Sequence, residues 1–201
     1  MKRTKLFFDT EFTGLHQHTT LISIGIISEC GKTFYAELND FKENQLNQWL
    51  KENVIKNLLF SEPPEGEDEH YSATRFKTKP GTDLYDSYSI ELRCDRFELA
   101  GELKKWLAQF DEVEIWSDTL AYDWVLFNQI FEHAFNIPKN VYYIPFDIAT
   151  LMRMKGIDPD INREEFISNM AMEIPKNLKM RKHNALWDAF VIRACFNKLN
   201  I

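Results

Sequence analysis

The sequence is poor in cysteine and has no long apolar run. Its three cysteines, Cys30, Cys94 and Cys195, are far apart among 201 residues, and none belongs to a CxxC pair. This number and spacing exclude a disulfide framework and a zinc knuckle, and favour free thiols. The longest strongly apolar stretches, such as residues 21–27, fall well short of the ~20 residues that a membrane-spanning helix needs. We therefore expect no transmembrane segment.

Positive charge is also scarce. The chain has 24 lysines and arginines against 31 aspartates and glutamates, which gives a formal net charge of −7. This balance excludes a protein that binds polyanions through bulk charge alone, so a nucleic acid partner would require local cations or metal ions. Near the amino terminus a strand-like run is interrupted by Asp9, unlike the continuous apolar region of a signal peptide. We expect a cytoplasmic protein.

What the sequence does contain is the composition of an ordinary globular domain. Apolar residues make up 44% of the chain and charged residues 27%, and 201 residues are enough to bury a core. We expect a single domain that spans residues 1–201. Within it, residues 61–90 include an acidic, proline-containing stretch and a further turn signal at Pro80, so we expect an extended loop or insertion there.

The order of the apolar patterns predicts a mixed sheet. Three strands are expected first, joined by short connections into an antiparallel meander: residues 4–9, residues 21–28 and a half-buried strand at 33–38. A helical region follows from residue 43, with a break near residues 53–54. Later helices are expected at 97–110, 122–135, 147–154, 164–170 and 185–199, and later strands at 113–116 and 141–146. This order indicates an α/β fold in which helices flank the sheet.

The first strand ends in Asp9-Thr10-Glu11, where two carboxylates are separated by one residue. Side chains two positions apart on a strand lie on the same face. Two carboxylates at close range raise each other's pKa, and a divalent cation would remove that repulsion. Asp9 and Glu11 are therefore candidate metal ligands. The alternative is that the strand has simply reached solvent by Asp9.

Further acids occur at or near predicted helices. Asp123 follows the strand at 113–116, and Asp188 lies among apolar residues of the last helix. Asp123 could simply interact with a helix terminus, and Asp188 could face outward instead of requiring a partner. Asp118 is better placed as a helix N-cap than as a ligand. His183 precedes the last helix, where it is either a base on a loop beside a metal site or an ordinary surface histidine.

Taken together, these residues resemble the motifs of the DEDDh 3′–5′ exonucleases. That family has an Asp-x-Glu motif, a second motif that ends in Tyr-Asp or Phe-Asp, and a third of the form His-x-x-x-x-Asp. The matching residues here are Asp9 to Glu11, Tyr122-Asp123, and His183 to Asp188. The resemblance covers nearly the whole chain and implies a ribonuclease H-like fold, with a mixed five-stranded sheet flanked by helices.

Among these enzymes the chain is most similar to the small bacterial exoribonuclease AS group. The likeness lies in Asp-Thr-Glu-Phe from residue 9, in Leu-Ile-Ser-Ile-Gly from residue 21 and in Ala-Tyr-Asp from residue 121. Two departures bear on substrate preference. Thr119 stands where many members have an asparagine, four residues before the aspartate of the second motif, and residues 61–90 are additional.

The resemblance implies hydrolysis with two metal ions. Asp9, Glu11, Asp123 and Asp188 would bind two Mg²⁺ ions, for which Mn²⁺ could substitute, because carboxylate oxygens are the ligands that these hard cations prefer. The ions would hold the scissile phosphate at the 3′ end of the strand. His183, with an ordinary pKa near ~6.5, would accept a proton from the attacking water. The expected products are nucleoside 5′-monophosphates released one at a time.

Binding of the strand itself has several candidates. Thr10, Phe12 and Leu15 lie in or just after the first motif, and Phe12 and Leu15 would stack on or wedge the terminal bases. Phe12 could instead pack in the core. Four cations precede the histidine of the third motif: Lys176, Lys179, Arg181 and Lys182. They either hold backbone phosphates or form a solvated basic loop.

The nature of the nucleic acid stays open at this stage. Single-stranded RNA is the expected substrate, but a proofreading-type exonuclease acting on DNA would use the same five residues, since sugar choice depends on contacts to the 2′-hydroxyl. An inactive, nucleic-acid-binding scaffold is a third possibility, against which the presence of all five residues argues. The resemblance also implies that a homodimer could form.

Overall fold

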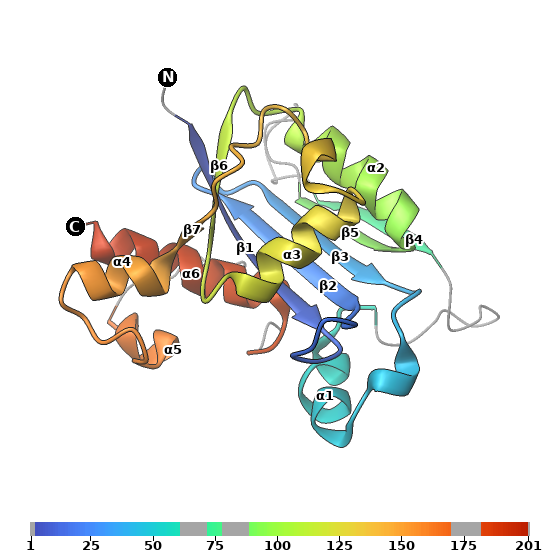
Figure 1. Ribbon diagram of the computed structural model, residues 1–201, viewed down its shortest axis with the longest axis horizontal. Coiled ribbons are helices and arrows are strands. Elements are labelled where there is room, and N and C mark those ends of the chain that lie inside the picture. Colours follow the sequence, from blue (N-terminus) through green and yellow to red (C-terminus); the bar gives the residue numbers. More distant parts are fainter. Residues whose placement is uncertain (1–2, 61–71, 78–88, 170–181, 201) are drawn as a thin grey trace.

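A computed structural model describes residues 3–60, 72–77, 89–169 and 182–200 of the chain. Their strands form one mixed sheet in the order β4-β5-β3-β2-β1-β6-β7, flanked by helices (Figure 1). The strands are β1 (Thr4–Phe12), β2 (Leu21–Ser28), β3 (Thr33–Leu38), β4 (Ala73–Lys77), β5 (Ser89–Cys94), β6 (Val113–Ser117) and β7 (Phe146–Asp147). The predicted α/β class, a mixed sheet flanked by helices, is confirmed.

The centre of the sheet has the predicted order. β1 pairs antiparallel with β2, and β2 pairs antiparallel with β3, which is the expected meander. β6 then runs parallel to β1, and β7 runs parallel to β6. Because β1 and β6 run in the same direction, their carboxyl ends lie at the same edge of the sheet, and the segments that follow them are brought together there.

The sheet has seven strands instead of the expected five, because residues 61–90 are not a loop throughout. β4 lies within this segment and β5 begins near its end. β5 pairs parallel with β3, and β4 pairs antiparallel with β5. The added strands make β3 an interior strand whose six residues are all buried, so the expectation of a half-buried strand was also wrong. Residues 61–71 and 78–88 lie outside the described residues.

β7 is shorter than the strand predicted at residues 141–146. Val141 makes an isolated parallel bridge with Val113, and regular pairing with β6 begins only at Phe146. Pro145 separates the two pairings, and proline has no N–H group to donate to a neighbouring strand.

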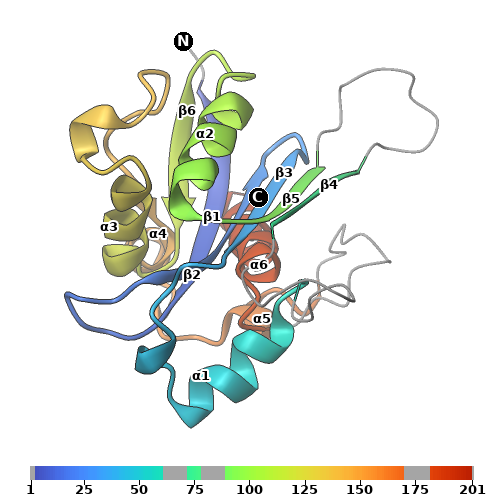
Figure 2. The same ribbon diagram turned by 90° about the vertical axis from the view of Figure 1, so that its right-hand side faces the viewer.

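Helices cover both faces of the sheet. α2 (Arg96–Leu107) and α3 (Ala121–Ile130) lie on one face, and α6 (Ala185–Leu199) lies on the other (Figure 2). α4 (Ile148–Met154) and α5 (Arg163–Phe166) pack against α6. No helix in the described ranges combines the length and the apolar character that crossing a bilayer would require.

The predicted helices are largely confirmed, and three of them are shorter than expected. The helix predicted to reach residue 110 ends at Leu107. The first helical region contains α1 (Gln48–Asn53) between the 3-10 turns Glu43–Gln45 and Ile55–Asn57, with the expected break after Asn53. The helix predicted to reach residue 135 ends at Ile130, because Glu132 adopts a positive φ of 66° that a helix cannot continue through. A 3-10 turn, Ala134–Asn136, follows it. The helix predicted at 164–170 is confined to α5.

The alternation of side chains along β1 separates two apolar cores. Leu6 and Phe8 pack with residues of α2 and α3, whereas Phe7 packs with residues of α6. The same alternation continues into the polar end of the strand. It directs Asp9 and Glu11 toward the α6 side and the residue between them toward the α3 side.

α6 approaches the sheet very closely at Gly25 of β2, which is paired with Asp9 of β1. A Cβ atom on residue 25 would lie 2.2 Å from the backbone nitrogen of Leu186 and 2.3 Å from the carbonyl carbon of Ala185. Only glycine fits here, because both neighbours are backbone atoms that cannot rotate away. The missing side chain therefore allows the first turn of α6 to lie beside the strand that carries Asp9.

We expect Gly25→Ala to lower the free energy of unfolding by about 1–3 kcal/mol or more, because the added methyl group displaces α6. Gly101→Ala is the matched control: its added Cβ, on an exposed position of α2, has no atom within 4 Å. That control should be neutral or should stabilise the protein by up to about 1 kcal/mol. Urea denaturation followed by circular dichroism measures both variants, and equal stabilities would contradict the close contact at Gly25.

Candidate active site

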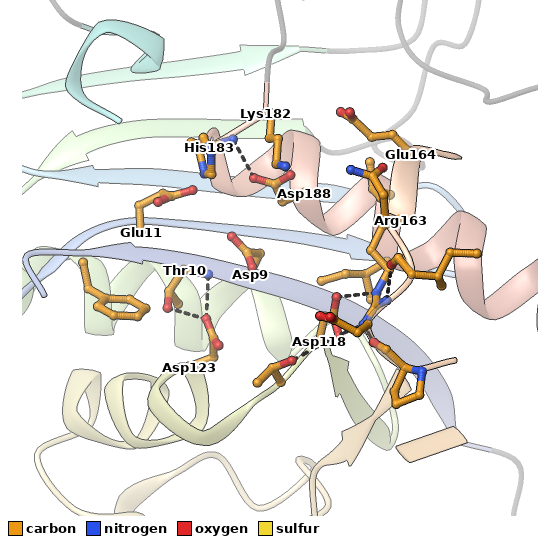
Figure 3. Close-up of a pocket in the computed structure, with 18 residues that line it drawn as sticks. Asp9, Thr10, Glu11, Asp118, Asp123, Arg163, Glu164, Lys182, His183 and Asp188 are labelled. Carbon is orange, nitrogen blue, oxygen red and sulfur yellow. Dashed lines mark hydrogen bonds and ion pairs between the residues drawn. The ribbon is translucent and has the colours of Figure 1, made fainter. Parts of the chain in front are cut away.

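Three elements bring acidic residues to one end of the sheet. β1 carries Asp9 and Glu11, α3 carries Asp123 and α6 carries Asp188, and all four line one cavity (Figure 3). The cavity has a volume of about 450 Å³ and is also lined by His183. The structure thus brings together all five residues that the motifs singled out.

Asp123 is tied to β1 by two hydrogen bonds. Its Oδ1 accepts from the backbone N–H of Thr10 at 3.0 Å and from the Thr10 hydroxyl at 2.6 Å. The Asp123 side chain is only 7% exposed, so it does not act as a solvent-facing partner of its helix terminus. Thr10 lies between the two acids of the first motif and connects the third acid to the same strand.

Asp188 is held by the segment that precedes its own helix. The backbone N–H of His183 donates to Asp188 Oδ2 at 2.9 Å. His183 has a φ of 65°, in the left-handed region that residues other than glycine seldom adopt. Asn184 is the N-cap of α6. The alternative in which Asp188 faces outward is wrong, because its carboxylate lines the cavity and has a partner.

The imidazole of His183 packs against Trp49 of α1. The two ring centroids are 4.9 Å apart and the rings are nearly perpendicular, at 73°. Trp49 is 52% exposed, so the ring that contacts the histidine also reaches solvent. The sequence predicts only that Trp49 lies in the helical region that begins at residue 43, because nothing in it links position 49 to position 183.

Asp118 does not act as the predicted N-cap. Leu120 occupies that position of α3 and makes no side-chain capping bond. The Asp118 carboxylate instead accepts from Arg163 Nε at 2.7 Å and from Arg163 Nη2 at 2.8 Å. This bidentate pair joins the loop after β6 to α5 along one wall of the cavity. The neighbouring Thr119, which stands where many DEDDh enzymes have asparagine, also lines the cavity and has a φ of 53°.

Only some of the predicted substrate contacts line the cavity that holds the acids. Phe12 lines the cavity and stacks on Tyr122, with ring centroids 5.5 Å apart, and Lys182 is exposed at the same cavity. Leu15 is 76% exposed on the loop between β1 and β2 and is not among the lining residues. Three of the predicted cations lie outside the described residues: Lys176, Lys179 and Arg181.

The environment of the four carboxylates disfavours their charged forms. Burial, followed by the charges of Asp123 and Asp188, raises the pKa of Asp9 well above its ordinary value. Burial and then Asp188 raise the pKa of Glu11 to about 8. Burial raises the pKa of Asp188 to about 7 and that of Asp123 to about 6, although hydrogen bonds from Thr10 oppose the shift at Asp123. These are the shifts expected where several acids share a confined space.

The donor set fits hard divalent cations. Oxygen atoms of Glu11 and Asp188 and a ring nitrogen of His183 all lie within 4.8 Å of one another, close enough to share one ion. Asp9 and Asp123 add further carboxylates, the ligands that Mg²⁺ and Mn²⁺ prefer. Positive charge among them would favour the ionised forms and reverse the pKa shifts.

Comparison with known proteins identifies the family of the chain. The family described as the 3′–5′ exoribonuclease Rv2179c-like domain matches residues 4–199. The chain belongs to this family. Two relatives from Mycobacterium tuberculosis are the 3′–5′ exoribonuclease Rv2179c of strain H37Rv and the 3′–5′ exoribonuclease MT2234.1 of strain CDC 1551. Each is 25% identical over 152 residues, which is 76% of this chain and 76% of the relative. Family membership makes the protein a 3′–5′ exonuclease, which confirms the predicted enzyme class.

We expect the stability of the protein in EDTA to fall as the pH rises from about 5 to about 8. The folded pKa values of Asp123, Asp188 and Glu11 are about 6, 7 and 8, above their ordinary values of 3.8, 3.8 and 4.5. The folded state therefore binds more protons than the unfolded state in this range, and it loses stability as those protons leave.

Urea denaturation at several pH values measures this dependence. Asp9→Asn removes one of the repelling charges and should flatten the slope, whereas Asp111→Asn, at an exposed position ahead of β6, should leave it unchanged. Stability that rises with pH over the same range would contradict the raised pKa values of these carboxylates in the folded state.

Proposed function

We propose that the protein is a metal-dependent exoribonuclease of the DEDDh type, which removes nucleoside 5′-monophosphates from the 3′ end of single-stranded RNA. The observation that carries this proposal is the convergence of four carboxylates and His183 in one cavity. The family description and the names of the two mycobacterial relatives support RNA as the substrate.

Asp9, Glu11, Asp123 and Asp188 are the residues that would hold two Mg²⁺ ions, or Mn²⁺ in their place. When bound, the ions would supply positive charge beside the scissile phosphate and favour ionisation of the attacking water. This role is consistent with the raised pKa values of Asp9 and Glu11, which burial and neighbouring negative charges produce and which bound cations would lower.

His183 is the proposed general base. Burial, and then the charge of Lys182, lower the pKa of His183 below its ordinary value of 6.5, so the imidazole is predominantly neutral at pH 7 and one ring nitrogen can accept a proton. The water oxygen forms a bond to phosphorus while the bond from phosphorus to the 3′ oxygen of the preceding nucleotide breaks. That 3′ oxygen takes up a proton from solvent, and the phosphate stays esterified to the 5′ oxygen of the released nucleoside.

The remaining contacts would position the strand. Lys182 lies exposed at the cavity and could bind a backbone phosphate, and the Phe12 ring offers a stacking surface beside the acids. Leu15, which projects from the loop after β1, would contact bases further from the cavity.

Labelled RNA and DNA oligonucleotides of one sequence, incubated with Mg²⁺, Mn²⁺ or EDTA, test the proposal. We expect mononucleotides from RNA with either metal, none with EDTA, and a loss of turnover in Asp9→Ala. Asp111→Ala is the matched control, since it removes an exposed aspartate that does not line the cavity. Release from DNA alone would favour a proofreading-type exonuclease, and no release with any metal would favour an inactive scaffold.

We expect His183→Ala to lower kcat by roughly 10² or more, the usual effect of losing a general base, while the fold is retained. His133→Ala, an exposed histidine beyond α3, should keep wild-type kcat. Single-turnover assays on labelled RNA, with circular dichroism as the check on folding, provide the measurement. Near-normal turnover in His183→Ala would remove this residue from the mechanism.

A further inference from the structure

The backbone that presents His183 requires support from its surroundings. A left-handed conformation at a non-glycine residue is disfavoured and persists only where neighbouring contacts impose it. The contacts on either side of His183 are well defined. The carbonyl oxygen of Lys182 accepts from Asn57 Nδ2 at 2.9 Å, and Asn184, directly after the histidine, is fully buried.

Both the oxygen and the nitrogen of the Asn184 side-chain amide form hydrogen bonds. Its Oδ1 accepts from the backbone N–H groups of Leu186 and Trp187, at 3.2 and 3.3 Å, and so caps α6. Its Nδ2 donates to the hydroxyl of Tyr35 at 3.2 Å and to the carbonyl oxygen of Asn57 at 2.9 Å. Capping requires only the oxygen atom, which Asp or Ser would also supply. The amide nitrogen therefore has a separate role, which is to fasten the residue after His183 to β3 and to the segment after α1.

A buried carboxylate fixes the direction of this network. The Tyr35 hydroxyl donates to Glu37 Oε1 at 2.7 Å, so it has only acceptor capacity left for Asn184. Glu37 is fully buried and also accepts from the backbone N–H of Phe60, and Arg93 lies 3.7 Å from its Oε2. Tyr35 and Glu37 lie two positions apart on β3, on the face that α6 covers.

The network therefore holds His183 from one side while Trp49 contacts it from another. β3, the segment that includes Asn57 and the first turn of α6 are joined through the single amide of Asn184. Trp49 belongs to α1, just before the turn that contains Asn57, and its ring meets the imidazole edge-on. A shift of the Asn184 amide would move His183 relative to both Trp49 and the acids on β1.

We infer that Asn184 is a positioning residue which, together with Tyr35 and Glu37, holds the His183 imidazole in its working place. The inference rests on the proposed function of His183 and goes beyond it, because none of the three residues would touch the substrate. The amide of Asn184 acts through the backbone of its neighbour, and the hydroxyl of Tyr35 fixes the position of that amide.

A double-mutant cycle on kcat tests this. Asn184→Asp keeps the capping oxygen and loses the donor, and Tyr35→Phe removes the hydroxyl and keeps the ring. We expect each to lower kcat by roughly tenfold or more with KM changed less than about twofold, as for a misplaced catalytic group. In a His183→Ala background neither change should lower kcat further. Asp95→Ala, which removes the N-cap of α2, is the matched control and should lower stability without changing kcat.

Nuclear magnetic resonance gives a readout that does not depend on activity. The imidazole protons of His183, identified by their loss in His183→Ala, should be shifted by the ring of Trp49 in the wild-type protein. We expect these signals to move in Asn184→Asp and in Tyr35→Phe, and to stay in place in Asp95→Ala. If Asn184→Asp does not fold, Tyr35→Phe decides the question alone.

The possible failures are distinguishable. The positioning role would be overturned if each change lowered kcat by the same factor in the wild-type and His183→Ala backgrounds, or if the imidazole signals did not move. Either result would count even if the enzyme degrades RNA. Absence of RNA degradation by the wild-type protein would instead refute the proposed function, while the imidazole signals would still report whether the network holds the ring.

Discussion

The burial of four mutually repelling carboxylates at one end of the sheet is the constraint on which the surrounding structure depends. Burial first, and then the charges of neighbouring acids, oppose ionisation of Asp9 and Glu11, and the charged forms would push β1, α3 and α6 apart. The fold opposes this with neighbouring groups: Thr10 binds Asp123, and the backbone N–H of His183 binds Asp188. Gly25 admits the first turn of α6 because it has no side chain. Ionisation of these carboxylates therefore lowers stability, and the divalent cations of the proposed function would restore it.

The alternation of a strand gives this arrangement its geometry. Successive residues of β1 point to opposite faces, so Asp9 and Glu11 face α6 while Thr10 faces α3. One strand can thus present two acids to the cavity and still hold a third acid through the residue between them. Parallel pairing of β1 and β6 completes the arrangement, because the loop after β6 leads directly into the helix that carries Asp123.

The sequence was informative where local pattern determines structure. Strand alternation and helical spacing predicted the meander, the break after Asn53 and the long last helix, and motif spacing predicted the five cavity residues. The sequence was misleading where contacts between segments far apart in the chain determine the structure. The strand at residues 33–38 was expected to be half-buried, but β5 pairs beside β3, and Glu37 is fully buried. Asp118 was expected to be a helix N-cap, but its carboxylate pairs with Arg163, which lies 45 positions further along the chain. No local pattern encodes either contact, and the same is true of Trp49 beside His183.

The pairing of Arg163 with Asp118 bears on how a polyanion could reach the cavity at all. Among the described residues that line it, the permanent cations are Arg163 and Lys182. Arg163 already donates to Asp118 and to the carbonyl oxygens of Ile161 and Pro159, so little of its charge is available to an incoming phosphate. Among the described residues that line the cavity, acidic side chains outnumber these two cations. Under the proposed function, divalent ions bound by the carboxylates would offset this negative charge as the RNA strand approaches, in addition to their part in hydrolysis.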